Sequence, residues 1–250
     1  MKWGTMMPIN SEYSEAAIVQ AIATSLDDFY KSLIANIDKL NINKIMKRKN
    51  PYLFRAKAMN GAAQIVDALL SAFVSSSEET IFGNVFFEPI ATAAAQGQKA
   101  LAEGVDIMIE RDSTIYAIAV KSGTSVFNAD SRKKQEQNFM AAQKLAQQAK
   151  KRFVPIVGYG YGKKSTTNRG LPKFYIELAG QAFWEELTGD NEFYIKLIRF
   201  MDKLPEKYVE DFDTAYQKAA NRLVKDFTND FCLEDGTIDW EKLVRFNSGM

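Results

Sequence analysis

The chain has 250 residues, 46% of them hydrophobic and 25% charged, with a formal net charge of +1, which is an ordinary composition for a globular protein with a sizeable core. It contains no histidine and a single cysteine, Cys232. This excludes Ser-His-Asp and Cys-His catalysis, histidine metal sites and internal disulfides, so any catalysis must use carboxylates, lysines, arginines, hydroxyls or an oxygen-bound divalent metal.

The first part of the sequence is expected to be helical. Residues 1–10 lack the pattern of a signal peptide, and no run of about 18 apolar residues follows, so we expect a cytoplasmic protein that does not span a membrane. Apolar residues recur every three or four positions over residues 11–40, which predicts one long or two consecutive amphipathic helices. Asn50-Pro51 breaks this pattern and predicts a short helix over residues 51–57.

Three serines then suggest a boundary between two further helices. A helix over residues 62–74 is expected to end at Ser75, Ser76 and Ser77. Both Ser75 with Glu78 and Ser76 with Glu79 have the spacing of a capping box, which predicts that a new helix begins there. Pro89 should kink or end it.

The middle of the chain changes to β character. Residues 105–111 and 114–120 are rich in β-branched residues and are joined through Asp112-Ser113, which predicts an antiparallel hairpin. The elements expected after it are a polar helix with Phe139, Ala142 and Leu145 on its inner face (131–151), a buried strand (153–159), an open basic loop, a strand (174–178) and helices (182–187, 193–203, 208–231 and about 240–246).

The order of these elements indicates an α/β protein with a central sheet flanked by helices and with helical additions at both ends. We expect an N-terminal helical region with a basic segment, a core, and a C-terminal helical region, although all three could form one domain. The boundaries predicted for them are 1–60, 61–180 and 181–250.

The charge is divided unevenly along the chain. Residues 41–60 hold six basic residues and no acid, and residues 130–173 hold eleven basic residues against two acids. Because affinity for nucleic acids depends on the local density of Lys and Arg, the two stretches suggest one electropositive face for a polyanion. The alternative is that they are solvated helix faces and loops.

The hairpin carries the residues that point to chemistry. Asp106 lies early on its first strand and Lys121 ends the second, so both side chains can converge at one end of the hairpin. These residues resemble the PD-(D/E)XK nuclease superfamily, and in particular type II restriction endonucleases, with Gly-x-Asp on the first strand and Lys-Ser-Gly ending the second. The resemblance rests mainly on residues 75–160 and implies a restriction-endonuclease-like fold.

The sequence departs from this motif at one position. The acid expected two residues before Lys121 is Ala119. In some restriction enzymes that acid comes from the following helix, where Glu136 is the candidate and Gln135 a neighbouring one. A further acid on the helix before the first strand would correspond to Glu79 or Glu78.

The resemblance implies a Mg²⁺-dependent reaction on DNA phosphate. Asp106, a second carboxylate and the backbone carbonyl of Val120 would hold the metal, and Lys121 would orient the attacking water or neutralise charge on the phosphate. The residues expected to contact DNA are Arg132, Lys133, Gln135, Lys163, Lys164 and Arg169.

The sequence therefore predicts a Mg²⁺-dependent, sequence-specific endonuclease that cleaves double-stranded DNA, a type II restriction enzyme acting as a homodimer. Two other interpretations stay open. The chain could be a DNA-binding module on an inactivated nuclease scaffold, as Ala119 suggests, or a helical protein-interaction protein.

Overall fold

The computed structural model describes residues 8–9, 12–100, 102–164 and 174–249. The chain forms two compact units, which we call unit 1 (residues 1–27 and 82–204) and unit 2 (residues 28–81 and 205–250). These units do not begin and end at the expected boundaries near residues 60 and 180. Helices α1 (Glu15–Asp38) and α4 (Ala62–Val85) each run from one unit into the other.

Unit 1 contains a mixed five-stranded sheet in the order β1-β2-β3-β4-β5. The first two pairings are antiparallel and the last two are parallel, which agrees with the expected central sheet. The short β1 was not expected from the sequence. The strands are β1 (Gln98–Lys99), β2 (Ile107–Arg111), β3 (Thr114–Lys121), β4 (Arg152–Tyr159) and β5 (Ile176–Ala179).

The predicted hairpin is confirmed as the pair β2 and β3. Ile107 pairs with Ile118, and the register continues to the turn. Asp112 and Ser113 have φ values of 44° and 59°. A two-residue turn with two positive φ values has the twist that right-handed antiparallel strands require.

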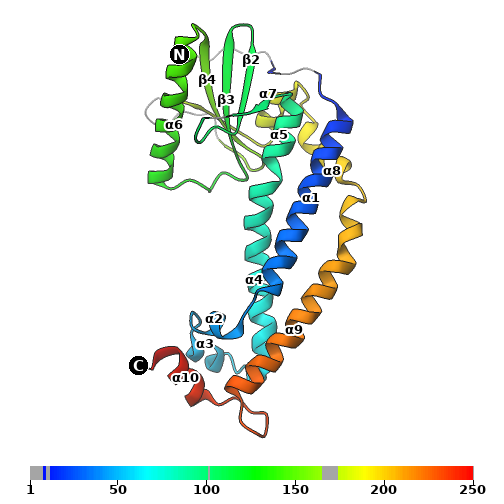
Figure 1. Ribbon diagram of the computed structural model, residues 1–250, viewed down its shortest axis with the longest axis vertical. Coiled ribbons are helices and arrows are strands. Elements are labelled where there is room, and N and C mark those ends of the chain that lie inside the picture. The colour runs from blue at the N-terminus through cyan, green and yellow to red at the C-terminus, as the bar shows by residue number, and fades with distance from the viewer. Residues whose placement is uncertain (1–7, 10–11, 101, 165–173, 250) are drawn as a thin grey trace. The chain divides into compact units, whose positions relative to one another are not determined.

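Helices cover both faces of this sheet (Figure 1). Helix α6 (Ala129–Gln148) packs on one face, against β3 and β4, and buries Phe139, Ala142 and Ala146. Leu145 was expected on this inner face but is 61% exposed. Ala142 and Ala146, four residues apart, lie on the side of the helix that faces the sheet, and Leu145 lies off that side. Figure 1 shows α5 (Phe87–Ala95) and α7 (Gln181–Thr188) on the other side of the sheet.

A glycine allows α7 to approach β4 closely. A Cβ atom at Gly158 would lie 2.0 Å from the ring of Phe183, so no larger residue fits without a shift of that ring. Helix α8 (Phe193–Met201) packs against α7 and completes the helices of unit 1. No helix in the described part of the chain is both long enough and apolar enough to cross a membrane.

The regular elements in the described residues of unit 2 are helices, apart from an isolated β-bridge between Cys232 and Ile238. It contains the second part of α1, most of α4, and α9 (Val209–Phe231). It also contains the short α2 (Ile42–Met46), which was not expected from the sequence. Apolar side chains from these helices, including Leu33, Ile65 and Leu223, are almost fully buried. The remaining elements are α3 (Pro51–Ala56), the 3₁₀ helix η1 (Leu204–Tyr208) and α10 (Trp240–Ser248).

The predicted break at Ser75–Ser77 is wrong. Helix α4 continues through these serines to Val85, so neither proposed capping box exists. Ser75 and Ser76 are exposed, so their hydroxyl groups keep their contact with water inside the helix. Another side of the same helix buries Leu70 and Val74. Pro89 lies in the first turn of α5, where a missing backbone N–H has no helical partner in any case.

Candidate active site

Asp106 is fixed at the end of the hairpin by both backbone and side-chain contacts. Its N–H donates to the Ile118 carbonyl at 2.9 Å, and its carbonyl accepts from the Ala100 N–H at 3.1 Å. Its carboxylate Oδ2 accepts a hydrogen bond of 2.7 Å from the Val120 N–H. The side chain is 23% exposed, so one acidic group is held in place and stays accessible.

Lys121 lies beside this carboxylate. Its Nζ is 3.5 Å from Asp106 Oδ2, and its side chain is 28% exposed. The structure therefore brings together Asp106, Val120 and Lys121, as the hairpin pattern predicts. An accessible carboxylate next to an accessible ammonium group can bind a cation and a phosphate side by side.

Ala119 occupies the position where the nuclease motif that the sequence resembles has its second acid. Extending the register of the hairpin by one residue places Asp106 opposite Ala119, so both side chains point to the face covered by α6. Ala119 is fully buried in a cluster with Phe139 and Val157. No acid on β3 replaces it.

Gln135 reaches the segment that leads to Asp106. Its Nε2 donates a hydrogen bond of 2.6 Å to the Gly104 carbonyl, two residues before Asp106, and the side chain is 5% exposed. Gly104 has φ of 71°, and a Cβ atom there would lie 2.1 Å from the Asn138 side chain. The flank of α6 that carries Gln135 and Asn138 therefore faces the candidate site.

Glu136 lies toward a different flank of α6. Its charge contributes to the raised pKa of Tyr175, after the larger effects of burial and of the Glu177 charge. One turn earlier on the helix, Arg132 pairs with Glu177 of β5. Glu136 therefore belongs to the β5 side of α6, and its proposed role as a metal ligand stays a prediction.

The two acids on α4 belong to unit 2. Glu79 is exposed, and the pKa of Glu78 is raised by burial and by the charge of Glu79. Glu78 lies near Tyr30, whose pKa is raised by burial and then by the Glu78 charge. Unit 1, taken by itself, includes neither acid.

The residues predicted to bind DNA differ in their exposure and in their contacts. Lys133 and Lys163 are exposed, and Arg169 lies outside the described residues. Gln135 is buried as described above. Arg132 and Lys164 both contact Glu177, so their charges are already paired within unit 1.

Glu177 organises a cluster that the sequence did not indicate. Its carboxylate, 8% exposed, accepts from Tyr159 Oη at 2.7 Å and from Arg132 Nη1 at 3.2 Å, and it contacts Lys164 Nζ. Burial first, and then the hydrogen bond to Glu177, raise the pKa of Tyr159. Tyr159 pairs with Lys121 in the register of β3 and β4, so this cluster borders the candidate site.

Glu177 does not supply the missing acid. It lies on β5, three strands away from Asp106 across the sheet, which corresponds to roughly 14 Å. Within the described residues, no three Asp, Glu, Cys or His side chains gather as a metal-binding group. A metal at Asp106 would use this carboxylate together with other oxygen ligands, such as carbonyl, amide, water or phosphate oxygens.

An accessible carboxylate beside a lysine at the end of a hairpin is an arrangement that enzymes acting on phosphate can use. A family model described as type II restriction endonuclease EcoO109I matches residues 16–208. The chain belongs to this family of DNA-cleaving enzymes. A comparison with curated proteins gave no match. Membership of a nuclease family does not favour the interpretation as a protein-interaction protein.

Proposed function

We propose that this protein is a Mg²⁺-dependent, sequence-specific endonuclease for double-stranded DNA, with the restriction-endonuclease-like fold of the PD-(D/E)XK superfamily. The observation that carries the proposal is the accessible Asp106 carboxylate 3.5 Å from Lys121, at the end of a hairpin in a chain of the restriction endonuclease family. We expect it to act in the cytoplasm, on the DNA present there.

The donor set around Asp106 fits Mg²⁺. This ion commonly uses one or two carboxylates, several waters and substrate phosphate oxygens. In an extended strand the N–H and C=O of one residue point to the same side, so the Val120 carbonyl faces the side on which its N–H meets Asp106. When bound, Mg²⁺ would neutralise charge on the scissile phosphate and lower the pKa of a water molecule.

The protein's own residues would position the reacting groups. Asp106 and the Val120 carbonyl would bind the ion, and Gln135 or Glu136 would add an oxygen ligand from α6. Lys121 would hold the attacking water or a phosphate oxygen, because its ammonium is the cation next to Asp106. Lys133 and Lys163, which are exposed, would contact the DNA backbone.

We also propose that the enzyme works as a homodimer. A two-fold dimer places two equal sites on the two strands of a palindromic sequence, so that one binding event leads to cleavage of both strands. Sedimentation analysis of the protein with and without DNA tests this part separately.

The function is tested by incubating the protein with plasmid and phage DNA. In Mg²⁺ we expect discrete fragments whose sequenced ends share one short motif, and in Ca²⁺ we expect DNA binding without cleavage. Absence of DNA binding in both ions at low salt would contradict the proposal.

A second candidate function is supported by Ala119. A site with one carboxylate could bind DNA and metal without cleaving, which would make the protein a DNA-binding module on a nuclease scaffold. In the same experiment this candidate predicts binding in Mg²⁺ and in Ca²⁺ with intact DNA in both.

A further inference from the structure

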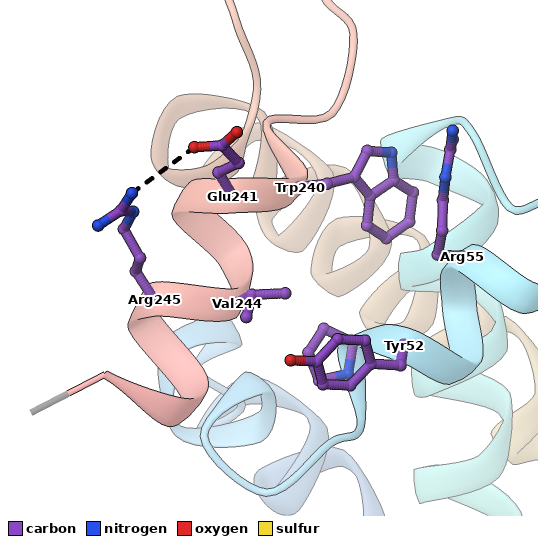
Figure 2. Close-up of a pocket in the computed structure, with 7 residues that line it drawn as sticks. Tyr52, Arg55, Trp240, Glu241, Val244 and Arg245 are labelled. Atoms are coloured by element: carbon purple, nitrogen blue, oxygen red, sulfur yellow. Dashed lines mark ion pairs between the residues drawn. The ribbon is translucent and has the colours of Figure 1, made fainter.

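Unit 2 contains a pocket of about 480 Å³ between α3 and α10. Figure 2 shows Val244 on the side of α10 that faces the pocket, with Trp240 and Tyr52 on either side of it. Arg55 lies beside Trp240, with its guanidinium 5.4 Å from the centre of the indole ring. The pocket thus combines apolar and aromatic walls with a cation.

The aromatic ring of Tyr52 is available to a ligand. The residue is 63% exposed, which is unusual for a large aromatic side chain on a short helix that also buries Pro51 and Phe54. Trp240 is partly buried and already has one cation near its ring. An open aromatic ring and an arginine fork at one pocket are the features that bind planar, negatively charged ligands.

The segment that forms one wall of the pocket is basic. Residues 41–60 contain no acid, and their six basic side chains are all exposed. Helix α10 is attached to this segment, because Asn247 donates to the carbonyls of Met46 at 2.9 Å and Lys49 at 2.8 Å. The one acid that lines the pocket, Glu241, is 3.6 Å from Arg245, and both are more than 80% exposed.

We propose that this pocket binds an unpaired nucleotide of single-stranded DNA. The base would stack on Tyr52 beside Trp240, and the flanking phosphates would pair with Arg55 and the basic residues of 41–60. A duplex hides the faces of its bases, so only unpaired bases can use these rings. A second copy of the chain fits less well, because it would bring a second segment of six uncompensated cations against the first.

This site lies outside the proposed cleavage chemistry. Trp240, Val244 and Arg245 come after residue 208, where the family match ends. Asp106 and Lys121 belong to unit 1, and the pocket belongs to unit 2. The inference therefore does not depend on whether the protein cleaves DNA.

The test uses the full chain in EDTA, where no metal supports cleavage. Binding of a fluorescein-labelled oligo-dT of 12 nucleotides is measured by anisotropy for the unchanged protein and for Tyr52→Ala and Arg55→Gln. We expect each variant to bind about tenfold more weakly. Tyr194→Ala and Arg111→Gln, exposed residues of the same types in unit 1, are the matched controls and should stay within about twofold.

Tryptophan fluorescence gives an independent measurement. Of the three tryptophans, Trp184 is fully buried and Trp3 lies outside the described residues. Oligo-dT should quench the unchanged protein and the Trp3→Phe variant, and Trp240→Phe should remove most of the quench. Unchanged oligo-dT affinity in Tyr52→Ala and Arg55→Gln would overturn the proposal. So would a shift of Tyr52→Ala from dimer to monomer with unchanged affinity, because the pocket would then bind a second copy.

Discussion

At the scale of single residues, Asp106 is the group on which cleavage should depend most. Asp106→Asn removes the charge but keeps an oxygen that can accept the Val120 N–H, so the end of the hairpin should stay intact. We expect cleavage to fall by roughly 10²-fold or more, with DNA binding in Ca²⁺ and thermal stability nearly unchanged. Glu110→Gln, an exposed acid on β2, the strand that follows Asp106, is the control and should cleave normally. Cleavage at the unchanged rate by Asp106→Asn would remove this aspartate from the site.

The second ligand of the proposed metal can be identified by comparing variants of two neighbouring residues on α6. Gln135 is bonded to the segment that leads to Asp106, whereas Glu136 lies toward β5. We therefore expect Gln135→Ala to lower cleavage by at least about tenfold, and Glu136→Ala to lower it less. The opposite order would make Glu136 the ligand, as the resemblance implies.

Adding Ala119→Glu to Gln135→Ala tests whether the missing acid can be restored. Position 119 faces the same side of the sheet as Asp106, so a carboxylate there is directed to the same metal. The site is fully buried, and the larger side chain should cost about 1–3 kcal/mol in stability. We expect partial recovery of cleavage at low temperature. No recovery in a variant that circular dichroism shows to be folded would contradict a shared ligand position.

At the scale of elements, Glu177 joins α6, β4 and the segment after β4. Glu177→Gln removes the negative charge that Arg132 and Lys164 share. We expect the free energy of unfolding in urea to fall on the order of 2 kcal/mol, less than for a fully buried pair because both cations keep some contact with solvent. Glu103→Gln breaks an exposed pair with Lys134 and should change stability by less than about 1 kcal/mol. Equal effects of both variants would mean that the cluster contributes little.

The elements show which features a sequence can predict. The hairpin was predictable because its pattern is local: two β-branched runs and a two-residue turn. The buried strand β4 was predictable from its apolar run, which parallel pairing on both sides requires. The serines of α4 misled the prediction because a local capping signal is weaker than the packing of Leu70 and Val74.

The candidate site also has one part that the sequence could predict and one part that it could not. Asp106 and Lys121 lie on one hairpin, so the pattern of its two strands brings them together. The Glu177 cluster was not predictable, because it depends on the register of β3, β4 and β5 and on the turn of α6 that faces them. The only signal was a glutamate within a short strand, which is equally typical of an exposed strand edge.

At the scale of the whole molecule, one half-buried acid should make stability depend on pH. Glu186 has a carboxylate oxygen that is buried without a hydrogen-bond partner among the described residues. Burial, and then the charge of Glu185, raise its pKa to about 7. The folded protein therefore keeps this proton to about pH 7, whereas the unfolded chain releases it near pH 4.3, so stability should fall as pH rises between these values.

Glu186→Gln should remove this part of the pH dependence. We expect its melting temperature to exceed that of the unchanged protein at pH 8 and the difference to shrink toward pH 5, where Glu186 is protonated in the folded state. Glu234→Gln, an exposed acid, is the control and should show no such trend. A constant difference across this range would show that Glu186 does not titrate there.

The overall charge pattern predicts a salt dependence of DNA binding. The two basic stretches lie in different units, with residues 41–60 in unit 2 and residues 130–173 in unit 1. We expect replacement of Lys133 and Lys163 by Ala to make the slope of log K against log salt shallower by up to about 0.9 per lost phosphate contact. Lys39→Ala and Lys225→Ala, exposed and outside both stretches, should leave the slope unchanged.

Because α1 and α4 each have residues in both units, the order of synthesis on the ribosome affects how the protein folds. Neither unit is a continuous stretch of chain, so synthesis cannot finish one before starting the other. Unit 1 is complete only after residue 204. Until then α1 and α4 lack α9, which contacts them through Tyr30 with Phe212 and Ser71 with Tyr216. A nascent chain released at residue 204 would thus expose an apolar helical surface, the kind of species that chaperones hold.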